Sequence, residues 1–394
     1  MLSLLKGLPA NVWRMGAAQA VMMTVMNVNI INTGLVGGVL APQPWLATLP
    51  LSLQFVAVMF STLPASLLMA HFGRRPIFII GVCLAIISCL VQAYGVFSGQ
   101  FMLFVAGSTM LGIGQGIAQF YRYAAADAVS DKDKPRALSL VLIGGLMAAF
   151  IGPEISFRSF DLFPEALYAG CFLVSAGFML VALFVLASAH LPKPDLSQGA
   201  GRPISAFLAM PRFIVGLVCA ALGYALMTFL MTATPLQIVN ISQLGNEANA
   251  RVIQWHVIAM FAPSLFTGAL ISRFGVERIL LGGVIFYLLT VIAALAGQGF
   301  WHYWMALVFL GLGWNFLFVG GSSIIASIAA PAERGRVQGV ADFVIFTCVA
   351  LCSLLAGALH SQFGWTILVY CALGPIAIIA ISLLLQWKMN MIRA

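Results

Sequence analysis

The sequence predicts an all-α integral membrane protein whose twelve transmembrane helices form two pseudo-symmetric six-helix bundles. Three observations lead to this fold class: the composition, a series of long apolar segments, and a repeat that relates the halves of the chain. Of the 394 residues, 62% are hydrophobic and only 8% are charged, whereas about a quarter of the residues in a soluble domain carry charge. Such a chain has too few polar residues to cover a water-soluble fold, so we expect it to lie in lipid.

Apolar segments of about 20 residues, long enough to cross about 30 Å of hydrocarbon as a helix, recur from one end of the chain to the other. They are too long and too continuous for the alternating strands of a membrane barrel. The twelve segments lie near residues 12–37, 45–70, 76–97, 101–126, 136–157, 164–188, 209–235, 251–272, 279–297, 301–329, 336–360 and 364–387.

The two halves of the chain resemble each other in local sequence. The stretch 111–115 (LGIGQ) returns about 200 residues later as 310–314 (LGLGW), and the basic turn at 72–75 has a counterpart at 273–278. Repeated halves within a bilayer are typical of alternating-access transporters, whose site lies between the halves. The repeat therefore indicates a function as well as a fold.

One polar segment, rich in Pro and Gly, divides the chain near its midpoint. Such composition is typical of a loop rather than of a helix. We expect a six-helix bundle at 1–189, a cytoplasmic linker at 190–208, and a second six-helix bundle at 209–394.

Basic residues predict the orientation of the chain. If the first helix starts in the cytoplasm, only Arg158 and Arg251 of the 19 Lys and Arg residues fall in outer loops, and Arg122 lies within a helix. The positive-inside rule then places both termini in the cytoplasm, as expected for an integral plasma membrane protein of the bacterial inner membrane. The net charge of +8 is explained by this topology, and no nucleic-acid partner is expected.

Three local motifs resemble those of the major facilitator superfamily. The segment 66–75 (SLLMAHFGRR) is similar to the family's loop between helices 2 and 3, and the segment 268–275 (GALISRFG) to the matching loop between helices 8 and 9. Gly152-Pro153 resembles the antiporter motif of helix 5. The resemblance implies two bundles that rock around a central site, with helices 1, 4, 7 and 10 lining the cavity.

The chain also departs from the family pattern. The acidic position of the two loops is occupied by Ala70 and Ser272, and the helix-4 arginine that drug–proton exchangers of the family often use falls on Ser108. These departures argue against standard proton-driven drug export.

The glycines and arginines at the two basic turns have physical roles that follow from their chemistry, independently of any family resemblance. Gly73 and Gly275 relieve steric strain in a tight turn. The neighbouring arginines can bond helix C-terminal carbonyls and pair with acids of adjacent cytoplasmic turns. Ion pairs that form in one conformation and break in the other would act as latches; in the other interpretation these residues only set topology and shape the turns. The candidate gating residues are Gly73, Arg74, Arg75, Asp127, Arg273, Gly275, Arg278, Glu333, Arg334 and Arg336.

Polar residues inside the apolar segments indicate a path for solute. On helix 4, Gln115, Gln119 and Arg122 follow one another at helical spacing, which places them along one face. Lipid disfavours such a stripe, so we expect it to face protein or a water-filled cavity. Hydrogen bonding between helices is the other interpretation. The candidate substrate-binding residues are Asn29, Asn32, Gln54, Gln115, Gln119, Arg122, Tyr224, Thr228, Met231, Thr232, His256, Trp314 and Asn315.

Ionisable residues within the predicted helices bear on coupling. Arg122 either holds an anionic or carbonyl group of a solute or forms a salt bridge to Asp127 or Asp342. Glu154 lies four residues before Arg158, which favours a local ion pair. His256 can titrate near neutral pH, although a hydrogen-bonded core histidine is the commoner outcome. The candidates for proton coupling are Glu154, His256 and Asp342, and none of them stands out as a proton carrier.

The sequence contains no enzymatic constellation. It has no Gly-rich phosphate loop followed by Lys-Ser/Thr, no nucleophile elbow and no His-Glu-x-x-His, so no cofactor and no metal site are expected. We predict a secondary active transporter that moves a small organic solute across the cell membrane by alternating access, with its site between the two bundles. Proton-coupled efflux of amphipathic drugs and a non-transporting membrane receptor are the alternatives. The expected partners are the small-molecule substrate, the lipid bilayer, and protons or another coupling ion, and the chain is expected to be a monomer.

Overall fold

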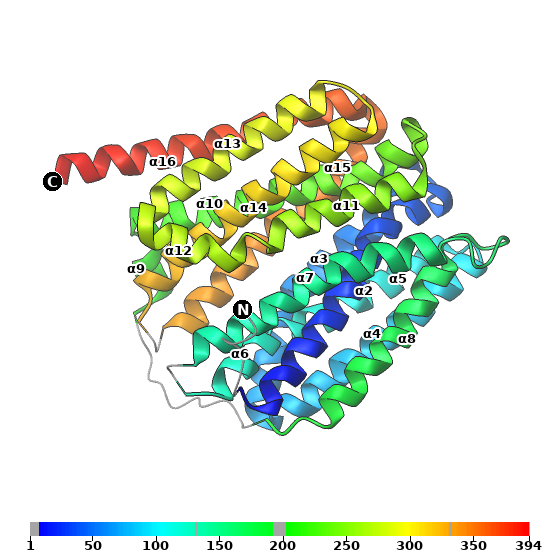
Figure 1. Cartoon of the computed structure of the whole chain (residues 1–394), viewed down its shortest axis with the longest axis horizontal. Helices are drawn as coiled ribbons and strands as arrows, with labels where there is room; N and C mark the ends of the chain where they lie inside the picture. The colour runs from blue at the N-terminus through cyan, green and yellow to red at the C-terminus, as the bar shows by residue number, and fades with distance from the viewer. Residues whose placement is uncertain (1–7, 131–132, 192–201, 331–332, 394) are drawn as a thin grey trace. The chain divides into compact units, whose positions relative to one another are not determined.

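The computed structural model describes residues 8–130, 133–191, 202–330 and 333–393. Within these ranges the chain is helical and contains no strand, which confirms the all-α fold class. The chain divides into two compact units, Met1–Leu196 (unit 1) and Ser197–Ala394 (unit 2), and Figure 1 shows the helices of each.

Unit 1 holds the first six predicted spans. The helix predicted first is the long α2, and the span predicted fourth is made of two helices, α5 and α6. Gly73, with a φ of 90°, ends one helix and lets the next begin directly at Arg74, because glycine alone adopts such a backbone without strain. The elements are α2 (Ala10–Leu40), η1 (Pro44–Leu46), α3 (Leu49–Phe72), α4 (Arg74–Phe97), α5 (Phe101–Ala118), α6 (Tyr121–Asp127), α7 (Lys134–Ser159) and α8 (Ala169–Ala187).

Unit 2 holds the last six predicted spans. Gly275, with a φ of 85°, makes the turn that Gly73 makes in unit 1. The elements are α9 (Ile204–Leu208), α10 (Pro211–Pro235), η2 (Leu236–Ile241), α11 (Gly245–Phe261), α12 (Ser264–Phe274), α13 (Val276–Leu295), α14 (Phe300–Ile328), α15 (Arg334–Cys371) and α16 (Leu373–Arg393).

Glycines hold the fourth span of unit 1 close to two neighbouring helices. A Cβ atom added to Gly112 of α5 would lie 2.2 Å from the backbone oxygen of Gln54 on α3. A Cβ atom added to Gly114 would lie 2.7 Å from the backbone oxygen of Gly81 on α4. No side chain fits at either position, so these glycines allow backbones to approach as small residues do in membrane bundles.

The repeated glycines of unit 2 do the same. A Cβ atom added to Gly311 of α14 would lie 2.6 Å from the backbone oxygen of His256 on α11, and one added to Gly313 would lie 2.3 Å from the ring of Tyr287 on α13. The glycines of the LGxG repeat thus allow close helix packing in both units. In each, the fourth span packs against the second and the third.

Three spans differ in shape from the uninterrupted helices that the sequence predicts. The fourth is divided because the N–H of Phe120 bonds to the carbonyl of Ile117, an i to i−3 contact that tightens the backbone into a turn. The eighth bends by 42° between α11 and α12, where Pro263 has no N–H to continue the helix. The seventh extends beyond 235 as the π-helix η2, up to Ile241.

The described helices are suited to a bilayer. By length and hydropathy alone, nine of them could cross a membrane, or ten if α11 and α12 form one bent span. One of the nine, Arg336–Lys388, contains two predicted spans that meet at Gly364, where φ is 75°. With these, the bent pair and α7, which is helical but not among the nine, each of the twelve predicted spans contains helix.

Candidate functional site

The amides predicted on helices 1, 2 and 4 bond to other polar groups inside unit 1. The Asn29 amide donates to Gln92 Oε1 at 3.2 Å, and Gln92 Nε2 donates to Ser108 Oγ at 2.8 Å. Gln54 Nε2 donates to Gln115 Oε1 at 3.2 Å. All five side chains are buried. These bonds tie α2, α4 and α5 together and α3 to α5, and Gln92 is a member that the sequence analysis missed.

Asn32 makes a further link within unit 1. Its Nδ2 donates to Ser156 Oγ at 2.8 Å and so joins α2 to α7. Glu154, on the same helix as Ser156, forms an ion pair with Arg158 at 2.6 Å, as the spacing of four residues predicts.

Gln119 and Arg122 lie at the break between α5 and α6. Gln119 occupies the turn, and Arg122 is the second residue of α6. Arg122 Nη2 donates to the Tyr123 hydroxyl at 3.1 Å, and its guanidinium lies 4.9 Å from the centre of the same ring. The helix break therefore takes Arg122 off the straight stripe that uninterrupted helical spacing predicts.

Unit 2 contains a group of aromatic side chains that we call the aromatic cluster. The Trp314 and Phe318 rings of α14 are stacked, with centroids 5.0 Å apart and planes 11° apart. Tyr224 of α10 stands edge-on to both, at 5.4 Å from each. Phe346 of α15 lies 5.9 Å from Tyr224, and Phe261 of α11 lies 5.8 Å from Trp314.

Only Tyr224 and Trp314 of this cluster were singled out from the sequence. The three phenylalanines were missed because an apolar residue does not stand out within an apolar span. They can be recognised only from the structure, in which α10, α11, α14 and α15 bring these rings into contact with Tyr224 and Trp314.

Polar atoms with no hydrogen bond lie beside the aromatic cluster. The hydroxyls of Thr228 and Thr232 and the indole nitrogen of Trp314 are buried and have no partner among the described residues. Thr228 and Thr232 are four and eight residues after Tyr224, on the face of α10 that Tyr224 occupies. Met231 is buried on the same helix.

His256 and Asn315 connect the helices around this cluster. His256 is buried, and its Nδ1 lies 2.7 Å from the Leu307 carbonyl, which ties α11 to α14. Asn315 Nδ2 donates to the Met260 carbonyl at 2.7 Å, and Asn315 Oδ1 accepts from Thr267 at 2.7 Å. Both donor and acceptor of Asn315 are thus engaged within unit 2.

At the basic turn of unit 1, the structure brings together the predicted arginine and acid. Arg74 Nη2 lies 2.5 Å from Asp127 Oδ2. The Arg74 side chain is 8% exposed and that of Asp127 is 45% exposed. Arg75 instead donates to the backbone carbonyl of Ala187. The pair joins α4 to the end of α6.

In unit 2 the acids pair with arginines other than those expected. Glu333 accepts from Arg202 Nη2 at 2.7 Å, from Arg202 Nε at 2.9 Å and from the Arg202 backbone N–H at 2.8 Å. These bonds, with one from the Ala330 N–H, lower the pKa of Glu333 from 4.5 to about 2. Glu277 lies 4.0 Å from Arg212. Arg202 and Arg212 were treated in the sequence analysis only as topology signals.

The remaining gating candidates of unit 2 have other surroundings. Arg273 covers the ring of Phe274 at 5.3 Å, Arg278 is exposed, and Arg336 donates to the backbone carbonyl of Arg202. The side chain of Arg334 lies outside the described residues.

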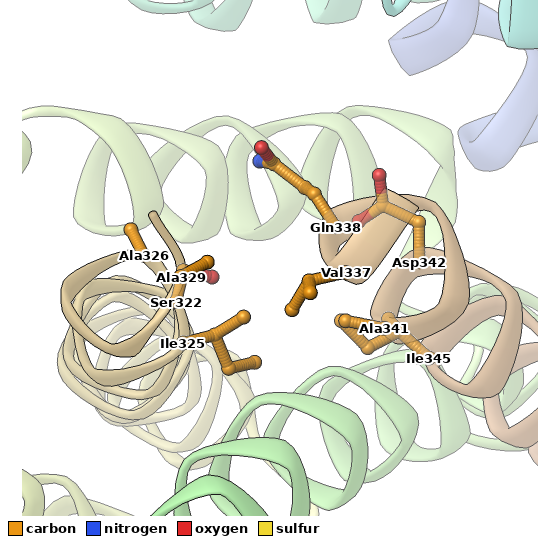
Figure 2. Close-up of a pocket in the computed structure, with 9 residues that line it drawn as sticks. All are labelled: Ser322, Ile325, Ala326, Ala329, Val337, Gln338, Ala341, Asp342 and Ile345. Atoms are coloured by element: carbon orange, nitrogen blue, oxygen red, sulfur yellow. The ribbon is translucent and has the colours of Figure 1, made fainter. Parts of the chain in front are cut away.

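A small pocket lies between α14 and α15 and contains Asp342 (Figure 2). Its volume is about 40 Å³, room for a few water molecules but not for a solute of several rings. In Figure 2 the polar ends of Gln338 and Asp342 lie on the same side of it. The lining residues are Ser322, Ile325, Ala326, Ala329, Val337, Gln338, Ala341, Asp342 and Ile345.

Known proteins of one family match most of the chain. The sequence profile of the Major Facilitator Superfamily matches residues 15–250 and 236–390. The riboflavin transporter RfnT of Brucella anthropi is 41% identical over 359 residues, which cover 90% of this chain and 90% of that protein.

Solved structures share the fold. The nucleoside transporter NupG superposes with a TM-score of 0.73 at 14% identity, over 95% of this chain and 99% of that one. A bacterial homologue of the human lysosomal transporter Spinster gives a TM-score of 0.71 at 13% identity, over 96% of both chains. At such identities the likeness concerns the fold alone.

Proposed function

Because this chain belongs to the Major Facilitator Superfamily, and is therefore an integral membrane transporter rather than an enzyme, we propose that it carries riboflavin or a closely related flavin across the membrane by alternating access. The 41% identity to a riboflavin transporter over 90% of both chains supports the choice of solute. It also supports a solute of the small organic class that the sequence predicts.

The aromatic cluster is the observation within the structure that carries this proposal. Planar conjugated rings pack favourably against aromatic side chains, either stacked or edge to face. Small-molecule sites are mostly apolar and add a few well-placed polar groups. Tyr224, Trp314 and Phe318 supply the apolar walls, and a flavin offers three fused, planar rings to them.

The amide groups of unit 1 have a different role in this proposal. Asn29, Gln54 and Gln115 are bonded to other side chains of the same unit, so we assign them to helix association, for which buried amides are suited in membranes. Tyr224, Thr228, Thr232 and Trp314 of unit 2 are the residues that we assign to the solute.

Coupling and orientation complete the proposal. Asp342 lines a pocket that has room for water, so Asp342 is the acid that we assign to proton coupling. The basic residues on the turns support our proposal that both termini lie in the cytoplasm, as the positive-inside rule favours.

Counterflow tests the solute independently of the direction and the energy source of transport. Liposomes that contain the purified protein and unlabelled riboflavin should accumulate labelled riboflavin from a trace outside, because exchange requires only that the site opens alternately to both sides. Excess unlabelled riboflavin outside should abolish the accumulation, and a nucleoside should not. If folded, reconstituted protein accumulates no label, riboflavin is not its solute.

A further inference from the structure

Three buried polar groups beside the aromatic cluster lack hydrogen bonds. They are the hydroxyls of Thr228 and Thr232 and the indole N–H of Trp314. Thr228 is fully buried, Thr232 is 2% exposed and Trp314 is 5% exposed. A buried donor or acceptor without a partner is destabilising and uncommon in native structures. Thr228 and Thr232 lie one turn apart on α10, and Trp314 of α14 contacts Tyr224 of that helix, so a solute that reaches this part of unit 2 could supply the missing partners.

The two threonines also differ from most other helical threonines of this chain. A threonine inside a helix usually donates its hydroxyl to the carbonyl four residues earlier. Six threonines do so here, at 2.7 to 3.0 Å: Thr24, Thr62, Thr109, Thr234, Thr290 and Thr347. Thr228 and Thr232 do not, although Thr234 on the same helix does. Their hydroxyls are therefore held away from the helix backbone.

The polar groups and the rings occur on the same two helices. Tyr224, Thr228 and Thr232 are four residues apart and share a face of α10. Tyr224 in turn contacts Trp314 of α14. Helical spacing on α10 and this ring contact therefore relate the polar groups to the aromatic cluster within unit 2.

The chemistry of the three groups defines what they can bind. An indole N–H only donates, and a hydroxyl both donates and accepts. Together they suit a planar ring whose edge carries carbonyl oxygens next to an N–H, which is an imide. The pyrimidine-dione end of a flavin has this pattern.

We propose that Thr228, Thr232 and Trp314 bind the imide edge of the flavin ring, while the aromatic cluster packs against its faces. The Trp314 N–H donates to a ring carbonyl, and the threonine hydroxyls accept from the imide N–H and donate to the second carbonyl. This inference rests on the proposed function, because it gives the orientation of the solute that the proposed function names.

Ligand analogues test the orientation without altering the protein. Equilibrium binding of labelled riboflavin to the purified wild-type protein is competed by 3-methylriboflavin, in which a methyl group replaces the imide proton, and by an analogue that lacks the two methyl groups of the far ring. The 3-methyl analogue should bind about tenfold more weakly than riboflavin, because one hydrogen bond is lost and a polar group stays unpaired. The far-ring analogue should bind nearly as well as riboflavin.

Threonine-to-valine variants locate the contact. Thr228→Val and Thr232→Val should each weaken riboflavin binding about two- to tenfold, since each loses one hydrogen bond without a change in shape. Thr234→Val is the matched control on the same helix, because the Thr234 hydroxyl already donates to Leu230 at 2.8 Å. The ratio of riboflavin affinity to 3-methylriboflavin affinity should fall in the two variants and stay unchanged in the control.

The outcomes separate this inference from the proposed function. If wild-type protein binds no riboflavin, the proposed function fails. If it binds riboflavin and 3-methylriboflavin equally, the protein makes no hydrogen bond to the imide N–H. Only the proposed orientation of the flavin is then overturned. The third outcome is that the ratio of riboflavin affinity to 3-methylriboflavin affinity is the same in Thr228→Val, Thr232→Val, Thr234→Val and the wild type. Other residues would then bind the imide edge, and the inference would likewise be overturned.

Discussion

Arg202 and Glu333 form an ion pair at 2.7 Å, although 131 residues separate them in the sequence. Arg202 also donates to the carbonyl of Ile328 at the end of α14, and Glu333 directly precedes α15. The Glu333 side chain is 5% exposed. The pair therefore fixes the segment before α9 onto the turn between α14 and α15, within unit 2.

This pair predicts a dependence of stability on pH. The pKa of Glu333 is about 2 in the folded protein against an ordinary 4.5. A lowered carboxyl pKa stabilises the folded state above pH 4.5, and this contribution is lost as the pH falls from 4.5 toward 2. Glu333→Gln should therefore lower the midpoint of thermal unfolding at pH 6 and show a smaller further loss than wild type between pH 4.5 and 2.

Arg202→Ala should reproduce the loss at pH 6, and Arg212→Ala serves as its control. Arg212 lies 4.0 Å from Glu277, and both side chains are well exposed, so that pair contributes about 0–1 kcal/mol. Identical pH profiles for wild type and Glu333→Gln would show that the Arg202 pair does not stabilise the fold.

The pair of Arg74 and Asp127 predicts an asymmetry between two variants. Arg74 is 8% exposed and Asp127 is 45% exposed. Asp127→Asn leaves a buried guanidinium without its counter-charge and should cost about 3 kcal/mol of stability. Arg74→Gln leaves an acid that water can solvate and should cost only about 1 kcal/mol.

Denaturant unfolding in detergent measures both costs. Arg75→Gln is the neighbouring control, because Arg75 donates to the backbone carbonyl of Ala187. Cysteine labelling near Ala70, with and without riboflavin, then reports whether loss of the pair shifts the protein between conformations. Equal stability of Asp127→Asn and Arg74→Gln would contradict the asymmetry of burial.

Trp314 predicts a graded effect on riboflavin counterflow. Trp314→Phe keeps an aromatic ring next to Phe318 and Tyr224 but removes the indole N–H, so the apparent affinity should fall about tenfold. Trp314→Ala also removes the ring contacts, each worth about 0.5–1.5 kcal/mol, and should abolish exchange. Trp301→Phe is the control, since Trp301 is 66% exposed. Wild-type affinity in Trp314→Ala would remove this residue from the site.

The repeated glycines predict a matched pair of packing defects. Gly112→Ala and Gly311→Ala place a methyl group 2.2 and 2.6 Å from backbone oxygens of α3 and α11. Backbone cannot move aside as a side chain does, so each should lower stability by about 1–3 kcal/mol. Gly177→Ala on α8 meets nothing within 4 Å and should be neutral or slightly stabilising. Thermal unfolding of the three variants makes the comparison.

Much of the fold follows from the sequence because a bilayer imposes simple local rules. A span must be apolar and about 20 residues long, so hydropathy alone locates all twelve helical spans. Turn glycines are predictable for the same local reason, since Gly73 and Gly275 adopt φ values of 90° and 85° that other residues avoid. The family also follows, because its motifs are short and contiguous in the sequence.

Which side chains meet was decided by the tertiary structure. The sequence predicts that Arg273 and Arg278 pair with acids of neighbouring cytoplasmic turns such as that of Glu333, yet the packing of unit 2 brings Arg202 to Glu333. Likewise Gln92 joins the amide network only because α4 packs against α5.

The candidate site shows the same division. Sequence alone determined that polar residues, Tyr224 and Trp314 lie within the apolar spans of helices 7 and 10, because each of these residues differs from its apolar neighbours. Only the tertiary structure decided that Phe261, Phe318 and Phe346 complete a cluster around Tyr224 and Trp314. The physical reason is that hydropathy depends on each residue by itself, whereas a binding surface depends on the rotation and spacing of helices, which the glycines and prolines of several spans set together.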